Sequence, residues 1–227
     1  MTSPASPAAL RRHVRTVLNR LRKRYGPLLP PRRSDPLEEL ILTVLSQHTS
    51  DVNADRSFAG LRGAFPTWDE VVEAPPGRIA EAIRSGGLAE TKAPRIQAIL
   101  REVHERRGAF DLTYLRDLPD QEARAELLSL PGVGPKTAAV VLSFSLDRDA
   151  MPVDTHVHRV TRRLGWIPPK TSAEHADRIL HELVPAGLRT ELHVALIRLG
   201  RDVCKAPTPR CRICPLKDIC PTAPRYL

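Results

Sequence analysis

The four cysteines of this 227-residue chain all lie near its C-terminal end, in the order Cys204-x6-Cys211-x2-Cys214-x5-Cys220. The sequence shows no secretory signal, and thiols that stay inside the cell remain reduced, so disulfides are not expected. Structural zinc sites usually pair two short Cys-x2–4-Cys hooks, whereas only one such hook occurs here. The longer flanking spans fit the four cysteines of a [4Fe-4S] cluster. The spacing therefore favours this cluster, with zinc as the alternative.

A second motif, LPGVGPKTA, spans residues 130–138. Gly132 and Gly134 allow the backbone to approach another molecule closely. Pro135 opens a helix whose free amides, including that of Thr137, can bind a phosphate. The motif predicts a helix–hairpin–helix DNA-binding element over about residues 122–144, and an ordinary turn between two helices is the alternative.

Lys136 lies in the first turn of that second helix. The positive end of the helix dipole disfavours an ammonium there, and burial against a bound nucleotide would lower the lysine pKa further. A neutral amine can attack the C1′ carbon of a damaged nucleotide and form a Schiff base. The alternative is a lysine that only contacts a phosphate.

Asp154 stands directly before a helical run in the string VDTHVHR. This position predicts an N-cap, and capping is compatible with catalysis because a cap carboxylate is held in place and stays ionised. Such an anion could stabilise positive charge on a sugar as its base departs, and it could assist proton transfers with Lys136. The same charge would raise the pKa of Lys136 and so oppose the helix dipole.

The formal charge of +9 is concentrated at the two ends of the chain. Nine basic residues and no acidic one occur between Met1 and Ser34, and the last 30 residues hold seven basic residues against two acidic ones. The ends therefore suggest a surface that binds a polyanion, or else a solvated charged face.

No apolar run approaches the roughly 20 residues that span a bilayer. The basic N-terminus fits a transit peptide or, more simply, an amphipathic helix.

Helical periodicity dominates, alternating strand patterns are absent, and 22 prolines separate the segments. These features predict an all-α protein of roughly ten helices. The expected helices cover Ala9–Tyr25, Pro36–Ser46, Asp51–Ala64, Trp68–Glu73, Pro76–Ser85, Lys92–Arg107, Glu122–Ser129, Lys136–Phe144, Asp154–Leu164, Ser172–Leu183 and Glu191–Val203.

From about Arg11 to Pro221 the chain resembles the endonuclease III family of helix–hairpin–helix DNA glycosylases. The resemblance depends on three motifs in a fixed order, which are the hairpin, then the segment with Asp154, then the four spaced cysteines. The resemblance implies two helical domains with a DNA cleft between them. One is a six-helix barrel, residues 31–148, and the other an iron–sulfur domain built from both termini, residues 1–30 and 149–227. It also implies that Lys136 is the nucleophile, that Asp154 is essential, and that the four cysteines hold the cluster.

The resemblance gives two further loops a role. Gln47, in LSQHTSD, would enter the gap left by a flipped nucleotide, and Leu88, after Gly86-Gly87, would wedge into the duplex. Read alone, Gln47 is polar surface and Leu88 is core. Ala89 and Glu90, which follow Leu88, depart from some family members. The loop carrying Lys205, Arg210 and Arg212 would contact DNA phosphates, ordered by a structural cluster.

The sequence therefore predicts a base excision repair enzyme with two activities, a glycosylase that removes oxidised pyrimidines and a lyase that cleaves the abasic site by β-elimination. The alternatives are a glycosylase of the same superfamily without lyase activity, or a cluster-bearing protein that binds DNA without catalysis. The expected partner is double-stranded DNA with damaged bases or abasic sites, without a membrane. We expect a monomer located in the cytoplasm with the nucleoid.

Overall fold

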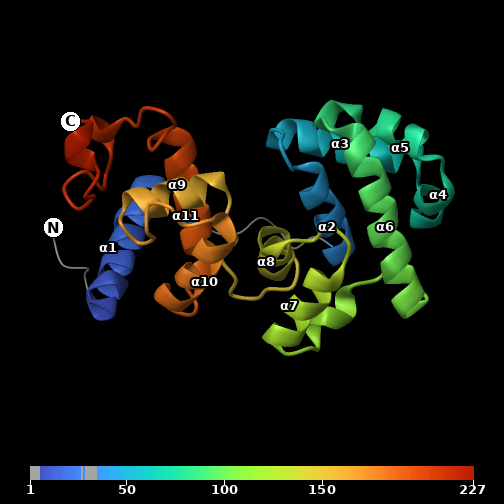
Figure 1. Ribbon diagram of the computed structural model, residues 1–227, viewed down its shortest axis with the longest axis horizontal. Helices are drawn as coiled ribbons and strands as arrows, with labels where there is room; N and C mark the ends of the chain where they lie inside the picture. The colour runs from blue at the N-terminus through green and yellow to red at the C-terminus, as the bar shows by residue number, and fades with distance from the viewer. Residues whose placement is uncertain (1–5, 27, 29–34) are drawn as a thin grey trace. The chain divides into compact units, whose positions relative to one another are not determined.

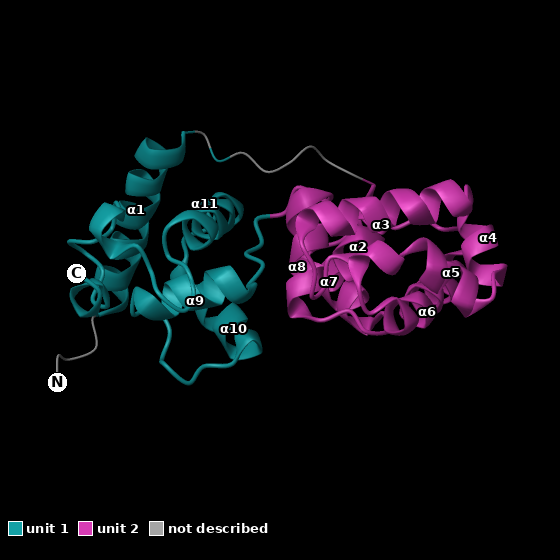
Figure 2. Ribbon diagram, turned by 90° about the horizontal axis from the view of Figure 1, so that it is seen from above, with its two compact units in different colours: residues 1–31, 149–227 teal, residues 32–148 magenta. Residues whose placement is uncertain are grey.

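The computed structural model describes residues 6–26, 28 and 35–227, and it divides into two compact units. Unit 1 comprises residues 1–31 and 149–227, and unit 2 comprises residues 32–148 (Figures 1 and 2). The described residues form helices and turns without a strand, which confirms the predicted all-α class. In this part of the chain, no helix has both the length and the apolar character needed to cross a membrane.

Unit 2 is built around α2 (Pro36–Leu45), a helix with seven of its ten residues buried. Asp35 caps this helix by accepting hydrogen bonds from the amides of Leu37 and Glu38, and Pro36 occupies its first turn. This start matches the sequence prediction, because Asp and Pro are favoured at these two positions. Around α2 lie α3 (Asp51–Ala64), α4 (Trp68–Glu73), α5 (Pro76–Ala82), η1 (Arg84–Gly86), α6 (Ala89–Arg107), η2 (Thr113–Arg116), α7 (Asp120–Ser129) and α8 (Pro135–Phe144). Of these, α3, α6 and α8 contact α2 directly.

Unit 1 joins the N-terminal helix to the C-terminal third of the chain (Figure 2). Its elements are α1 (Pro7–Tyr25), α9 (Thr155–Arg163), α10 (Ala173–Leu183), α11 (Arg189–Asp202), η3 (Cys211–Ile213) and η4 (Ala223–Arg225). The buried residues of α1, which are Val14, Val17, Leu18 and Leu21, recur every three to four positions and so form one apolar stripe. This stripe packs against α10 and α11, so that both ends of the sequence share one core.

Two helix boundaries in unit 2 differ from the sequence prediction by three residues. The helix that starts at Pro76 ends at Ala82 instead of Ser85, and the short turn η1 replaces its last residues. The next helix starts at Ala89, three residues before the predicted Lys92. The amides of Thr91 and Lys92 bond to the carbonyl of Leu88. The left-handed backbone of Leu88 makes the turn before the helix, which periodicity alone does not reveal.

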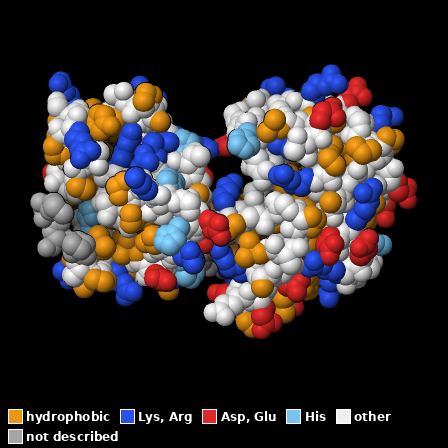
Figure 3. All heavy atoms as spheres, viewed as in Figure 1, with side chains coloured by type: hydrophobic (Ala, Val, Ile, Leu, Met, Phe, Trp, Pro, Cys, Tyr) orange, Lys and Arg blue, Asp and Glu red, His pale blue; other side chains and the backbone are white. Residues whose placement is uncertain are grey.

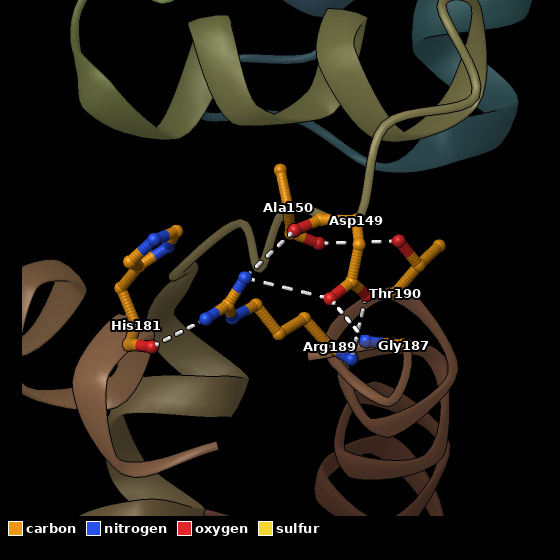
Figure 4. Close-up of polar contacts among 6 residues, drawn as sticks. All are labelled: Asp149, Ala150, His181, Gly187, Arg189 and Thr190. Carbon is orange, nitrogen blue, oxygen red and sulfur yellow. Dashed lines mark hydrogen bonds and ion pairs between the residues drawn. The ribbon is translucent and has the colours of Figure 1, made fainter. Parts of the chain in front are cut away.

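Asp149 anchors the chain where it enters unit 1 (Figure 4). Its carboxylate accepts hydrogen bonds from the amides of Gly187, at 2.6 Å, and Arg189, at 3.0 Å. These amides precede and begin α11, so Asp149 caps that helix from a distant part of the sequence. The Arg189 guanidinium in turn donates to the carbonyl of His181 at 2.9 Å, which ties the same corner to α10.

Candidate functional site

The glycine-rich turn lies between α7 and α8 in unit 2, and its two glycines serve different purposes. Gly132 has φ +73°, and a Cβ there would lie 2.9 Å from the Arg95 side chain. Gly134 is the N-cap of α8 with φ −97°, and no atom lies within 4 Å of the place where its Cβ would be. The fold therefore requires glycine at position 132, whereas nothing inside the protein requires it at position 134.

The first turn of α8 contains Lys136 and Thr137, behind Pro135 at the first helical position. No side chain caps this turn, so its amides form the kind of anion site found at helix N-termini. Lys136 is half-buried, and Thr137 is only 4% exposed. The Thr137 side chain is therefore buried, so that of its groups only the backbone amide could make the predicted DNA contact.

Asp154 lies in unit 1, where it is half-buried at the N-terminus of α9. Its carboxylate accepts a hydrogen bond of 2.7 Å from the amide of Val157, and its carbonyl accepts one from the amide of His158. The predicted N-cap is thus confirmed. Because this bond uses one carboxylate oxygen, the second oxygen remains available to act on a ligand.

The two loops assigned to DNA insertion are both in unit 2. Leu88 is 56% exposed and has φ +52°, so it is not the core residue that its type alone suggests. Gln47 is half-buried, and its Oε1 accepts a hydrogen bond of 3.0 Å from Arg95. Its neighbour His48 has φ +56°. Left-handed backbone at residues other than glycine costs about 1 kcal/mol or more and is concentrated at functional sites.

The four cysteine thiols are free and half-buried at the C-terminal end of unit 1. The pKa of Cys214 is raised to about 11, mainly by burial and to a smaller extent by negative charge on the other three thiols. Burial also raises the pKa of Cys211, with smaller contributions from Cys204 and Cys220. Four thiolates that repel one another in this way would be stabilised together by a cationic centre. The donor set therefore fits a four-cysteine cluster, although no group of three or more described His, Cys, Asp or Glu side chains is arranged to hold a metal ion.

Two arginines of α9, which sequence reasoning missed, hold the cysteine-bearing loop. Arg163 donates to the carbonyl and to the Sγ of Cys204, both at 3.3 Å, and to the carbonyl of Lys205 at 2.8 Å. Arg159 donates to the same Cys204 carbonyl at 3.0 Å. Their spacing of four residues places both on one helix face, which was the available signal. The predicted DNA contacts of the loop, Lys205, Arg210 and Arg212, are all exposed.

The positive charge of the protein belongs to unit 1. This unit holds 20 of the 35 Lys and Arg residues but only 8 of the 26 Asp and Glu residues, a balance of +12, which leaves −3 for unit 2. On the face in Figure 3, several Lys and Arg side chains lie together on unit 1, whereas acidic side chains are frequent on unit 2. A strongly basic unit is typical of proteins that bind nucleic acid.

Part of the basic N-terminus stabilises unit 1 itself. In α1, Arg11 donates to the Glu182 carbonyl, and three further arginines pair with acids of the C-terminal third: Arg20 with Asp218, Arg22 with Glu191 and Arg24 with Asp202. The exposed residues Arg12 and Arg15 are the better candidates for binding a polyanion. Arg32 and Arg33, which belong to the same basic stretch of the sequence, lie outside the described residues.

Residues 41–186 match the family described as HhH-GPD superfamily base excision DNA repair protein. Endonuclease III of Thermotoga maritima is 37% identical over 83% of this chain and 84% of its own length. Endonuclease III of Escherichia coli K12 is 34% identical over 90% of this chain and 92% of its own length. A putative DNA glycosylase of Arabidopsis thaliana is 40% identical, and this chain spans 56% of that relative's length.

Solved structures show the same similarity. A trapped covalent intermediate of endonuclease III with DNA, containing an estranged adenine, superimposes with a TM-score of 0.82 and 31% identity, covering 95% of this chain and 97% of that one. A thermostable thymine-DNA glycosylase superimposes with a TM-score of 0.75 at 21% identity, which shows a shared fold.

Proposed function

Because the chain belongs to the HhH-GPD superfamily of base excision DNA repair proteins, we infer that it acts on DNA as the endonuclease III proteins do. It is a base excision repair enzyme, a DNA glycosylase and abasic-site lyase. The relatives named endonuclease III match it over most of both chains, so the likeness extends beyond the hairpin motif. What remains to propose is which residues act and on which lesions.

The proposal for the nucleophile is carried by one observation, the half-buried Lys136 in the first turn of α8. The positive end of the helix dipole favours the neutral amine, which is the form that attacks carbon. In the proposed step, Lys136 Nζ bonds to C1′ of the damaged nucleotide, and the bond from C1′ to the base breaks as the base takes up a proton. The sugar ring then opens as the C1′–O4′ bond breaks and O4′ takes up a proton, which leaves a protonated imine between Lys136 and C1′ and makes the C2′ proton acidic. Loss of that proton expels the 3′ phosphate, and water then releases the lysine.

Asp154 would supply negative charge while the sugar becomes positively charged. Its hydrogen bond to the Val157 amide fixes the carboxylate before substrate binds, so no reorganisation is needed during the reaction. We assign Asp154 this electrostatic role and the assistance of proton transfers.

Cys204, Cys211, Cys214 and Cys220 would hold a [4Fe-4S] cluster. When bound, the cluster would cross-link the C-terminal loop and take no part in bond breaking. Arg159 and Arg163 would fix this loop from α9, and the exposed Lys205, Arg210 and Arg212 would bind DNA phosphates. We propose the basic unit 1 as the iron–sulfur domain and unit 2, residues 32–148, as the helical barrel domain.

The proposed substrates are oxidised pyrimidines and abasic sites in duplex DNA, acted on by a monomer in the cytoplasm. Similarity to an endonuclease III captured as a covalent intermediate with DNA supports imine chemistry over hydrolysis by a glycosylase without lyase activity. The same similarity argues against a protein that only binds DNA, since Lys136 is present at the hairpin position.

Borohydride trapping tests the nucleophile. The reductant converts an imine between lysine and C1′ into a stable covalent bond, so the parent protein should become linked to a duplex that contains an abasic site. Lys136→Gln should give no adduct and no strand cleavage, while Lys170→Gln, which alters an exposed lysine of unit 1, should behave as the parent. Trapping or cleavage by Lys136→Gln at the parent's level would remove Lys136 from the mechanism.

A further inference from the structure

Lys92 of α6 is an unusual residue because it is a lysine with only 2% of its surface exposed. Its Nζ donates to the carbonyl of Leu45 at 2.7 Å and to the carbonyl of Gly86 at 2.9 Å. No carboxylate in the described part of the chain pairs with it, and burial lowers its pKa. Lysines are rarely buried unless they are paired, so the two carbonyls must compensate for the lost hydration.

Those carbonyls are the C-terminal ends of two different elements, α2 and η1. A helix C-terminus carries partial negative charge, and a lysine can cap it by binding the last carbonyls. Lys92 therefore caps two elements at once. The backbone around Gly86 is also closely packed, because a Cβ on Gly86 would lie 2.6 Å from the Ser57 Oγ and 3.6 Å from the Leu45 carbonyl oxygen.

Each of the two carbonyls lies two residues before one of the proposed inserting residues. Leu45 precedes the turn that contains Gln47, and Gly86 precedes Gly87 and Leu88. Leu88 and His48, the neighbour of Gln47, both have left-handed backbone. Such conformations persist only where the surroundings hold them. The buried ammonium of Lys92 thus binds the backbone just before both strained turns.

Arg95 extends this arrangement one turn further along α6. Its Nη1 donates to the Gln47 Oε1 at 3.0 Å, and its side chain lies 2.9 Å from the place where a Cβ on Gly132 would be. Arginine can only donate, so Gln47 must present its oxygen to Arg95 and keeps its two N–H groups for another partner. Positions 92 and 95, three residues apart, share one face of α6.

We propose that Lys92 and Arg95 are positioning residues that hold Gln47 and Leu88 at a fixed separation, beside the hairpin turn, so that both side chains enter the same gap in the duplex. This inference rests on the proposed function, because it assumes that the two loops insert into DNA. Neither residue touches the reacting atoms. Without them each loop would still exist, but the two tips would no longer be set for simultaneous insertion.

The test uses a duplex with a tetrahydrofuran abasic analogue opposite 2-aminopurine, whose fluorescence rises when the base is unstacked. Lys92→Met should lower the preference for this duplex over undamaged DNA by about tenfold or more, because a wedge that is no longer held in place cannot offset the cost of unstacking the bases. The fluorescence rise should be lost as well. Gln97→Met is the matched control, since Gln97 lies on the same helix, is also 2% exposed, and donates to the carbonyls of Val71, Val72 and Ala74.

Both substitutions remove buried hydrogen bonds and should lower the melting temperature, but only Lys92→Met should change discrimination and fluorescence. Arg95→Met, at a half-buried position, provides a second variant in case Lys92→Met does not fold, and it should also lose the fluorescence rise. Folded Lys92→Met or Arg95→Met with the parent's preference and signal would overturn the positioning role alone. A parent protein without preference for the abasic duplex would overturn the proposed function and this inference with it.

Discussion

In unit 1 the Asp154 carboxylate accepts a hydrogen bond of 2.7 Å from the backbone amide of Val157, three residues further along the chain. The same side chain therefore caps α9 and carries the charge that we assign to catalysis. These two tasks can be separated, because an asparagine can accept the capping hydrogen bond but has no negative charge.

Asp154→Asn should lower the single-turnover rate by about 10²- to 10³-fold, as expected when one preorganised electrostatic contact is lost. The free energy of unfolding should change by no more than about 1 kcal/mol, since the cap is retained. Kinetics measured beside thermal melting checks both values. A large loss of stability with an unchanged rate per folded molecule would leave Asp154 with a capping role only.

The two hairpin glycines should respond differently to alanine. Gly132→Ala should destabilise the protein by about 1–3 kcal/mol, because position 132 has positive φ and its Cβ would meet the Arg95 side chain. Gly134→Ala should alter stability by no more than about 1 kcal/mol, but it should weaken DNA binding because a methyl group would stand where a phosphate approaches. Melting curves and titrations with an undamaged duplex distinguish the two effects. Unchanged affinity in Gly134→Ala would contradict the phosphate contact.

The purified protein should contain about four iron atoms per chain and show a broad visible absorbance. Cys211→Ser should lose iron and colour and should melt at a lower temperature, because a structural metal centre contributes directly to folding. Metal analysis of protein prepared without oxygen is the decisive measurement. One zinc and no iron per chain would show that the cysteines form a zinc site.

Alkaline pH should weaken unit 1 through Tyr25, whose hydroxyl donates to Asp202 at 3.1 Å. Burial, followed by this hydrogen bond, raises the pKa of Tyr25 from 10.0 to about 12. The folded state therefore keeps its proton longer than the unfolded state, so the stabilisation is complete below pH 10 and is lost as the pH rises toward 12. Tyr25→Phe should be less stable than the parent at pH 8 and should approach it by pH 12. A constant difference in unfolding free energy across this range would contradict the assignment.

Most helices could be predicted from local signals alone. Asp35-Pro36 marks the start of α2, and the stripe from Val14 to Leu21 marks the buried face of α1, because capping and periodicity depend on residues within a few positions of one another. The same holds for the proposed chemistry. The cysteine spacing, the hairpin string around Lys136 and the aspartate before α9 are all compact motifs, which is why the sequence alone identified the family.

Tertiary structure decided which side chains support those motifs. Lys92 contacts the carbonyl of Leu45, 47 residues away, and Arg95 contacts Gln47, 48 residues away. Arg163 contacts Cys204, 41 residues away. The sequence does not distinguish a buried lysine that caps two elements from a solvated lysine, because burial depends on how distant segments pack. Helix caps and short motifs involve residues that are close in sequence, so they can be predicted from the sequence. The long-range hydrogen bonds that hold the loops form only after folding brings their partners together.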